Sequence, residues 1–306
     1  MGNRRRHASH LVIAAFLATT TVAFGAPPEP GVAAAPQTIV TIEWHDGNAD
    51  QINLIPILQD YGFNATFLVN TGPILAGNQA NLSVADLRSL FEAGNEIAGH
   101  TLDHVNIQPL STADARDQVC TDRNNLLSIG NPDLFQPTSL AYPFASFDDA
   151  SEDVAHYCGY NGASATAGLT LKGPVANTVP PADPYAVRTV PAIKKSTKLL
   201  TMTRFVDAAE IQAQTDGSAW TIFVFHHLCG PHEHCGPYVI SETKLRSFFD
   251  YLQAEAGDGV VVETMQQVIG GSVRGSIRCS LPLRGRRRST TATAAAVASL
   301  ARAPSG

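Results

Sequence analysis

Residues 37–50 read QTIVTIEWHDGNAD, and this stretch decides how the rest of the chain is interpreted. Its first eight residues, 37–44, are rich in β-branched and aromatic side chains, which is typical of a buried strand. The polar residues 45–47 end that strand, and residues 50–61 then place apolar side chains at helical spacing. The stretch therefore predicts a strand that leads through a short loop into a helix, the repeating unit of an α/β protein.

The same alternation of strands and helices continues to residue 263. Expected strands are 65–69, 96–98, 139–142, 162–165, 220–225 and 259–263, and expected helices are 83–93, 148–157, 201–213 and 241–254. Alternation over this length predicts an α/β fold with a parallel sheet, long enough to close into a barrel.

Composition places the chain among globular proteins. Of its 306 residues, 44% are apolar and only 16% are charged, which excludes a disordered or fibrous chain and allows one large domain. The formal net charge of -6 combines an acidic body, residues 36–273, with arginines gathered at both ends. An acidic body argues against a nucleic-acid partner, because such a surface needs clustered cations, and it also fits poorly with an anionic substrate.

The two ends predict export from the cell. Residues 1–25 combine arginines, an apolar stretch and small residues, which predicts a secretory signal peptide whose apolar run is too short for a stable membrane span. Residues 26–36 form a Pro/Ala-rich linker, residues 37–273 the domain, and residues 274–306 a basic low-complexity tail. We therefore expect a secreted or extracellular protein whose tail is solvated, with binding to the cell wall or another anionic polymer as the alternative role for the tail.

Five cysteines agree with an exported protein, in which thiols usually pair. The expected pairs are Cys120 with Cys158 and Cys229 with Cys235, which leaves Cys279 over. Because segment 229–235 also carries two histidines, a structural zinc site is the alternative for that segment.

Residues with chemically active side chains follow the ends of several expected strands. Asp46, His100, the pair Tyr142-Pro143 and His226 each stand where an expected strand stops. In a parallel α/β barrel all strands open on one face at their carboxyl ends, so these residues are expected to meet there. This convergence predicts an active site.

A metal site is predicted within that group. His100 and His104 are four residues apart, so on one helical turn both imidazoles would reach the same ion. Asp46 is the expected third ligand, and three protein ligands with one position left for water make a catalytic arrangement. Zinc is the expected ion, although Co2+, Ni2+ or Mn2+ suits the same donors.

Five stretches of the chain resemble the polysaccharide deacetylase family, also called the NodB homology domain or carbohydrate esterase family 4. They are IEWHDGNAD (42–50), ATF (65–67), GNEIAGHTLDH (94–104), AYPF (141–144) and VFH (224–226). The resemblance covers roughly residues 37–270 and implies a distorted (β/α) barrel of about seven strands. It further implies a divalent metal held by Asp46, His100 and His104, and hydrolysis of acetyl groups on a sugar polymer.

The resemblance also implies roles for residues on two other strands. His226 corresponds to the family's general acid, which returns a proton to the leaving amine. The motif at Tyr142, Pro143 and Phe144 corresponds to the family's substrate-binding or oxyanion segment, where a backbone N–H near Phe144 would stabilise the oxyanion. The adjacent His227 is expected to be structural, because successive strand residues face opposite sides.

Two positions depart from the family pattern. His45 stands where the family carries the aspartate that acts as general base, and Ala141 stands where it carries an arginine that pairs with this base. Three interpretations of His45 remain open: a substitute general base, an additional metal ligand, or a sign of weak or absent activity.

The function expected from the sequence is a secreted, metal-dependent hydrolase. It would remove N-acetyl groups from a cell-wall or extracellular polysaccharide, with a metal-activated water attacking the acetyl carbonyl. A weakly active or inactive glycan-binding relative and an O-acetyl esterase are the alternatives. We expect an acetylated polysaccharide as the partner, no nucleic acid, no stable membrane span and a monomeric protein.

Overall fold

The computed structural model describes residues 36–130, 135–230, 236–277 and 279. The predicted signal peptide, nearly all of the linker, most of the basic tail and the predicted cysteine partner Cys235 lie outside the described residues. Among the helices of the described ranges, none combines the length and the apolar character that a membrane crossing requires.

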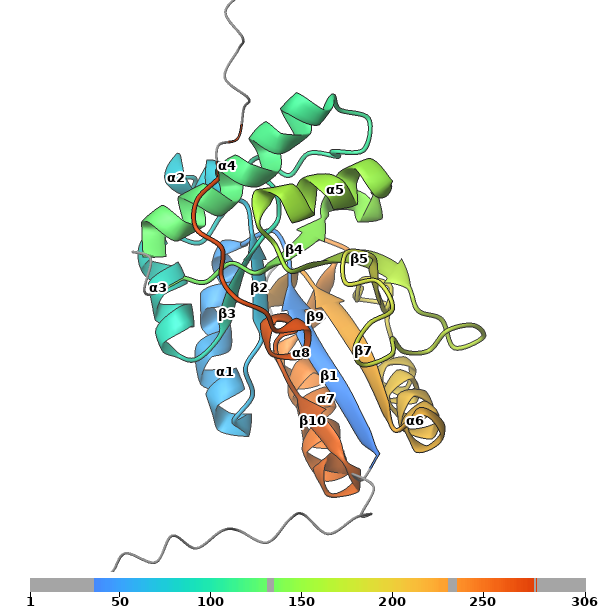
Figure 1. Ribbon diagram of the computed structural model, residues 1–306. Helices are drawn as coiled ribbons and strands as arrows, with labels where there is room; N and C mark the ends of the chain where they lie inside the picture. The colour runs from blue at the N-terminus through green and yellow to red at the C-terminus, as the bar shows by residue number, and fades with distance from the viewer. Residues whose placement is uncertain (1–35, 131–134, 231–235, 278, 280–306) are drawn as a thin grey trace, which may run out of the picture. The chain divides into compact units, whose positions relative to one another are not determined.

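Parallel strands form the centre of the domain (Figure 1). The first strand, β1, pairs over its whole length with β7 and near its carboxyl end with β2, and the sheet then continues from β2 through β3, β4 and β5 to β6. Their bounds are β1 Gln37–Trp44, β2 Thr66–Val69, β3 Glu96–Gly99, β4 Ser139–Tyr142, β5 Gly162–Gly168, β6 Val187–Thr189 and β7 Ser218–Phe225. Strand β10 (Val260–Val262) pairs with the amino-terminal part of β1.

The two ends of this sheet meet between β6 and β7. Just beyond β6, the N–H of Val190 donates to the carbonyl of Ile222 over 2.8 Å, and the N–H of Ile193 donates to that of Val224 over the same distance. The ladder between β5 and β6 contains a register shift, and β3 and β4 share a single registered pair. The seven strands therefore form the distorted barrel that the sequence predicts.

Helices connect the strands, as expected for parallel pairing. Their bounds are η1 Ala49–Asn53, α1 Leu54–Tyr61, α2 Thr71–Leu75, α3 Val84–Glu92, α4 Thr112–Gly130, η2 Pro143–Ala145, α5 Asp149–Cys158, α6 Leu199–Asp216, α7 Glu242–Ala254, η3 Glu255–Asp258 and α8 Met265–Ile269. A separate parallel pair is formed by β8 (His227–Cys229) and β9 (Val239–Ser241). The predicted helices within 83–93, 148–157, 201–213 and 241–254 are confirmed, whereas α4, β6, β8 and β9 were not predicted as separate elements.

Local capping explains where two of the predicted helices begin. Ser83 Oγ accepts from the N–H of Asp86, while the Asp86 carboxylate accepts from the N–H of Ser83 over 2.8 Å. This reciprocal pair satisfies two backbone donors at the start of α3 and confirms Ser83 as its N-cap. Asp148 caps α5 through a single interaction, in which its side chain accepts from the N–H of Ser151 over 3.0 Å.

The disulfide between Cys120 and Cys158 joins α4 to α5, as predicted. Cys229 is also disulfide-bonded, and its predicted partner lies outside the described residues. Cys279 is a free cysteine, also as predicted.

The segment after α8 runs back along α4 (Figure 1). Arg123 of α4 donates to the carbonyl of Gly275 over 3.3 Å, and Asn124 donates to that of Ile277 over 2.7 Å. The domain's contacts thus continue past the predicted boundary at residue 273, because polar groups of α4 hold a segment that has no hydrophobic periodicity of its own.

Candidate active site

The expected strand ends meet on one face of the barrel. A cavity of about 500 Å³ opens there, and its walls include His45, Asp46, His100, His104, Phe144 and His226. These side chains follow the carboxyl ends of β1, β3, β4 and β7. Of the strand-end residues expected to meet, Asp46, His100 and His226 therefore do so, whereas Tyr142 and Pro143 do not line the cavity.

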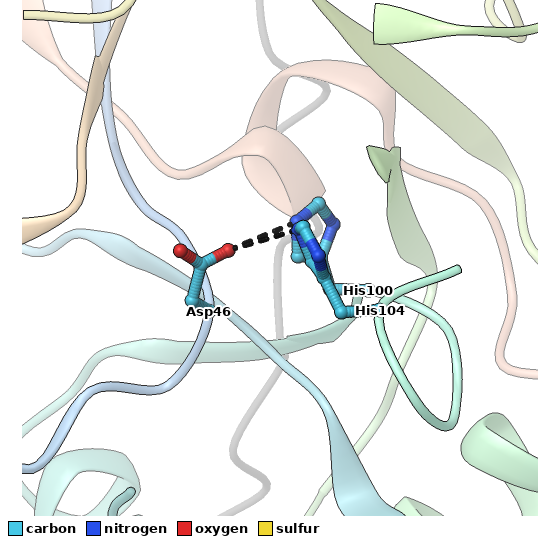
Figure 2. Close-up of side chains that lie close together, drawn as sticks. All are labelled: Asp46, His100 and His104. Carbon is cyan, nitrogen blue, oxygen red and sulfur yellow. Dashed lines mark ion pairs between the residues drawn. The ribbon is translucent and has the colours of Figure 1, made fainter. Parts of the chain in front are cut away.

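Asp46, His100 and His104 all line this cavity. Figure 2 shows the carboxylate of Asp46 pointing toward the two imidazole rings. Asp46 Oδ1 lies 3.4 Å from Nε2 of His100 and 3.2 Å from Nε2 of His104. One donor atom from each of the three residues lies within 4.8 Å of the others, an arrangement that could hold a metal ion. One carboxylate oxygen and two imidazole nitrogens are donors that zinc prefers.

The polar atoms of this cluster fit a cation. Asp46 Oδ1 is buried and has no hydrogen-bond partner among the described residues, although two ring nitrogens face it. A buried carboxylate oxygen without a partner is costly, and a cation between it and the two imidazoles would remove that cost.

The link between the two histidines differs from the prediction. Residues 100–104 form a loop and not a helical turn, with Thr101 and His104 in the left-handed region at φ 67° and 54°. Asp46 also has a positive φ, of 72°. Such conformations cost non-glycine residues about 1–3 kcal/mol each, so surrounding contacts must hold them. One such contact is a hydrogen bond of 2.9 Å from Asn70 Nδ2 to the carbonyl of Thr101.

Two contacts orient His100. Its Nδ1–H donates to the carbonyl of Ala141 over 2.8 Å, which leaves Nε2 as the nitrogen that faces Asp46. Its backbone N–H donates to the carboxylate of Asp122, which also accepts from the N–H and hydroxyl of Thr71. Burial raises the pKa of Asp122 to about 7, against the effect of these hydrogen bonds. The hydrogen bond from Nδ1–H of His100 to Ala141 sets the tautomer that a metal ligand needs, with Nε2 unprotonated.

His45 is buried beside the cluster and is paired with a carboxyl group. Its Nε2 lies 2.9 Å from Oε2 of Glu43, a residue that is itself fully buried in β1. Burial raises the pKa of Glu43 to about 8, while burial and the neighbouring imidazoles lower the pKa of His45. Glu43 engages Nε2 of His45, and His45 is not among the three candidate ligands found in the described residues.

His226 faces the cavity from the end of β7. Its ring centroid lies 5.5 Å from that of His45. Burial lowers its pKa to about 4, and the nearby His100 adds to this effect while Asp46 opposes it. Its Nδ1 is buried without a hydrogen-bond partner in the described part of the chain. His226 is thus neutral at pH 7, and no carboxylate of the described residues orients its ring.

His227 has a different environment, in agreement with its expected structural role. Its Nδ1–H donates to the carboxylate of Asp50 over 2.8 Å, and this carboxylate also accepts from the N–H of Leu228 over 2.6 Å. The hydrogen bond to Asp50 raises the pKa of His227, against the effect of burial. His227 therefore fixes the start of β8 to η1.

Of the three residues predicted to bind substrate or the oxyanion, Phe144 lines the cavity and the other two do not. Tyr142 and Pro143 are buried and do not line the cavity, and the ring of Tyr142 stacks on Phe147 at 4.9 Å. Phe144 is 67% exposed, lines the cavity and packs edge-on against His104 at 4.7 Å. A substrate can thus contact the side chain of Phe144, whereas Tyr142 and Pro143 hold the segment in place.

Three buried polar residues that support the site were not predicted: Glu43, Gln51 and Asp122. Gln51 Nε2 donates to the carbonyls of both His45 and His226, which ties the ends of β1 and β7 together. For Glu43 a signal was available, because strand residues two apart share a face and Glu43 precedes His45 by two. Gln51 and Asp122 lie on helical segments, where the sequence gives no comparable signal.

Comparison with known proteins supports the family resemblance. Residues 33–163 match the family model described as Polysaccharide deacetylase, which confirms the resemblance drawn from the motifs. This region contains the three candidate ligands and His45 and ends before His226. No curated protein matches the chain.

Several solved structures are similar over part or most of the chain. The Streptococcus pyogenes deacetylase PplD, in complex with acetate, is 22% identical with a TM-score of 0.40, and the match covers 50% of this chain and 63% of PplD. A mutant of the peptidoglycan deacetylase PdaC from Bacillus subtilis is 18% identical, with 76% and 90% covered and a TM-score of 0.44. A CE4 family pseudoenzyme from Bacillus anthracis is 14% identical, with 78% and 67% covered and a TM-score of 0.46.

Proposed function

Because residues 33–163 match the polysaccharide deacetylase family, we propose that this protein is a secreted, metal-dependent hydrolase that removes N-acetyl groups from a cell-wall or extracellular polysaccharide. The observation that carries the proposal is the convergence of Asp46, His100 and His104 in the wall of an open cavity. A divalent ion bound there, most simply Zn2+, would polarise the acetyl carbonyl and activate a water molecule.

His45 is the residue we assign as general base. It lines the cavity, and Glu43 fixes its ring through Nε2, which leaves Nδ1 to accept a proton from the attacking water. This pair takes the place of the family's aspartate base and its arginine partner. The replacement is consistent physically, because an arginine would disfavour the protonated imidazole, whereas a carboxylate favours it.

The proton taken from water must reach the leaving amine. His226, which is neutral at pH 7, can donate only after it has gained a proton, and the protonated ring of His45 lies 5.5 Å from it. We therefore assign His45 to accept the proton and His226 to pass it to the amine nitrogen. Protons are conserved in this step, because the one proton that leaves the water is the one that reaches the amine.

The exposed ring of Phe144 supports contact with sugar. It stands beside His104 at the mouth of the cavity, where its apolar face can pack against the carbon face of a pyranose ring. This contact would place the acetyl group toward the three candidate ligands.

A glycan-binding protein without catalysis is the second candidate. Two observations favour it: His45 replaces the family's aspartate, and Nδ1 of His226 is buried without a partner among the described residues. Such a protein would keep the metal and the cavity but release no acetate.

Acetate release distinguishes these functions. Wild type and the variants Asp46→Ala and His45→Ala are supplied with Zn2+ and with acetylated chitooligosaccharides, peptidoglycan or acetylxylan. His156→Ala serves as matched control, because His156 is exposed on α5. We expect release from an N-acetylated substrate by wild type and the control, and at least a hundredfold loss in both site variants.

Each other outcome has a defined meaning. No release from any substrate, with binding retained, would establish the glycan-binding function. Release from acetylxylan alone would establish an O-acetyl esterase. Loss in Asp46→Ala with full activity in His45→Ala would show that His45 is not the base.

A further inference from the structure

The lysines of this chain are concentrated beside the cavity. The sequence contains five lysines, and four of them are Lys194, Lys195, Lys198 and Lys244. Lys194 is part of the cavity wall, and Lys195 and Lys198 follow it in the same segment of the chain. Lys244 of α7 donates to backbone carbonyls of that segment. Because the rest of the body is acidic, this placement gathers positive charge next to the cavity.

Hydrogen bonds within the chain hold the turn of residues 194–197 in a defined conformation. The N–H of Lys194 donates to Thr197 Oγ1 over 3.0 Å, and the N–H of Thr197 donates back to the carbonyl of Lys194 over 2.8 Å. Lys244 Nζ donates to the carbonyls of Lys195 and Thr197 over 3.1 and 2.9 Å. Lys244 thus braces the turn, while the ammonium of Lys194 stays available.

Lys194 lies at the outer end of a row of contacts that begins at the candidate active site. The ring of Tyr238 lies 5.2 Å from the ring of His226, and Lys194 Nζ lies 5.0 Å from the Tyr238 centroid. The ammonium of Lys194 has no carboxylate partner among the described residues, and Asp46 is the only carboxylate in the described cavity wall. Lys194 therefore presents a positive charge to a part of the substrate other than the acetyl group.

We propose that Lys194 binds a carboxylate carried by the substrate, so that the site selects acetylated glycans with acidic sugars over neutral ones. The proposal rests on the proposed function, because it assigns the substrate class of the same cavity. It also revises the expectation that an acidic body fits poorly with an anionic substrate, since local charge at the cavity outweighs the average charge of the surface. An ammonium beside an aromatic ring suits a carboxylate through a charge-assisted hydrogen bond.

Four defined oligosaccharides test the proposal. Chitohexaose is neutral, and hyaluronan hexasaccharide carries uronic carboxylates. An oligomer of alternating N-acetylglucosamine and N-acetylmuramic acid carries lactyl carboxylates, and its methyl ester is the uncharged match. The proteins are wild type, Lys194→Met, Lys194→Arg and the control Lys195→Met, which changes an exposed neighbour outside the cavity wall.

We expect wild type to bind at least one carboxylate oligomer about tenfold more tightly than its uncharged counterpart, in Kd by calorimetry and in KM where acetate is released. Lys194→Met should weaken binding of the carboxylate oligomer about tenfold more than binding of its uncharged counterpart, whereas Lys194→Arg and Lys195→Met should keep the preference. The two acidic oligomers show whether the lactyl or the uronic carboxylate is recognised.

Two results would overturn the proposal: equal affinity of wild type for charged and uncharged oligomers, or equal weakening of both by Lys194→Met. A failure of the proposed function is recognised separately. In that case no acetate is released from any oligomer, and the calorimetric comparison still decides whether Lys194 binds a carboxylate.

Discussion

Glu43 and His45 share a hydrogen bond of 2.9 Å within the barrel, and both side chains are almost completely buried. Glu43 lies on β1 and His45 directly follows that strand, and Ser164 of β5 also donates to the Glu43 carboxylate over 3.2 Å inside the barrel. Glu43 orients the imidazole of His45, which we assign as the general base. Asp46 directly follows His45 in the chain.

Substitution of Glu43 tests this positioning role. Glu43→Gln keeps the size and a hydrogen-bonding oxygen but removes the negative charge that stabilises the protonated ring. We expect kcat to fall about tenfold to a hundredfold with KM and bound metal nearly unchanged. A parallel loss of metal or of folded protein would instead show a purely structural role, and Glu43→Asp should recover part of the activity.

The pH dependence of activity should follow the proton of the Glu43–His45 pair. Burial raises the pKa of Glu43 to about 8, so near neutral pH the pair retains a proton that a general base must first lose. We therefore expect kcat/KM to rise with pH through a single proton loss. A bound cation favours the anionic form and so moves the midpoint below 8. A flat profile from pH 5 to 9 would contradict the assignment, and Glu43→Gln should displace the rising limb.

Glu210 of α6 should make the stability of the protein depend on pH. Glu210 lies in a cavity with Asp207, Glu255 and Asp258, and burial together with these carboxylates raises its pKa to about 7. Because the unfolded chain has the lower pKa, the folded state gains stability from the protonated form. This contribution is complete below about pH 4.5 and is lost as the pH rises to 7.

Glu210→Gln should therefore stabilise the protein at pH 8 and leave it unchanged at pH 4. After a discount for solvent screening of this partly exposed group, we expect about 0.5–1 kcal/mol in urea denaturation at pH 8. Glu92→Gln, on the exposed face of α3, should have no such pH-dependent effect. Equal effects of Glu210→Gln at both pH values would exclude the carboxylate cluster as the cause.

The disulfide between α4 and α5 should contribute strongly to stability. Cys120 and Cys158 are separated by 38 residues, and a crosslink over such a loop stabilises by about 3–4 kcal/mol in the chain-entropy model. We expect the double variant Cys120→Ala/Cys158→Ala to lose this amount in urea denaturation. Cys279→Ser, which removes the free thiol, should lose much less, and equal losses would show that the crosslink itself matters little.

The sequence predicted the parts of the fold that depend on hydrophobic periodicity. Strands β1 and β7 are long, apolar and β-branched, and helices α3 and α7 have apolar faces and capping serines. Because every strand of a parallel barrel opens on the same face, these elements were sufficient to place His45, Asp46 and His226 together. The positions of these residues directly after expected strands thus predicted that their side chains meet at one site.

Features that depend on tertiary contacts were not predictable in the same way. Helix α4 is mostly polar, with buried Asp122 and Arg123 in place of a continuous apolar face, so its periodicity is weak. The loop from His100 to His104 takes left-handed conformations that only its surroundings stabilise. The burial of Tyr142 likewise follows from its position in the barrel and not from its motif.

The measurement that tests the central claim most directly is the metal content of the purified protein. After dialysis with Zn2+, elemental analysis of wild type should find about one ion per chain, and zinc should raise the Tm. His104→Ala and Asp46→Ala should each lose the ion and the zinc-dependent rise in Tm while remaining folded, whereas His156→Ala should keep both. Wild type without bound ion, or variants that bind it as well as wild type, would contradict a metal site formed by Asp46, His100 and His104.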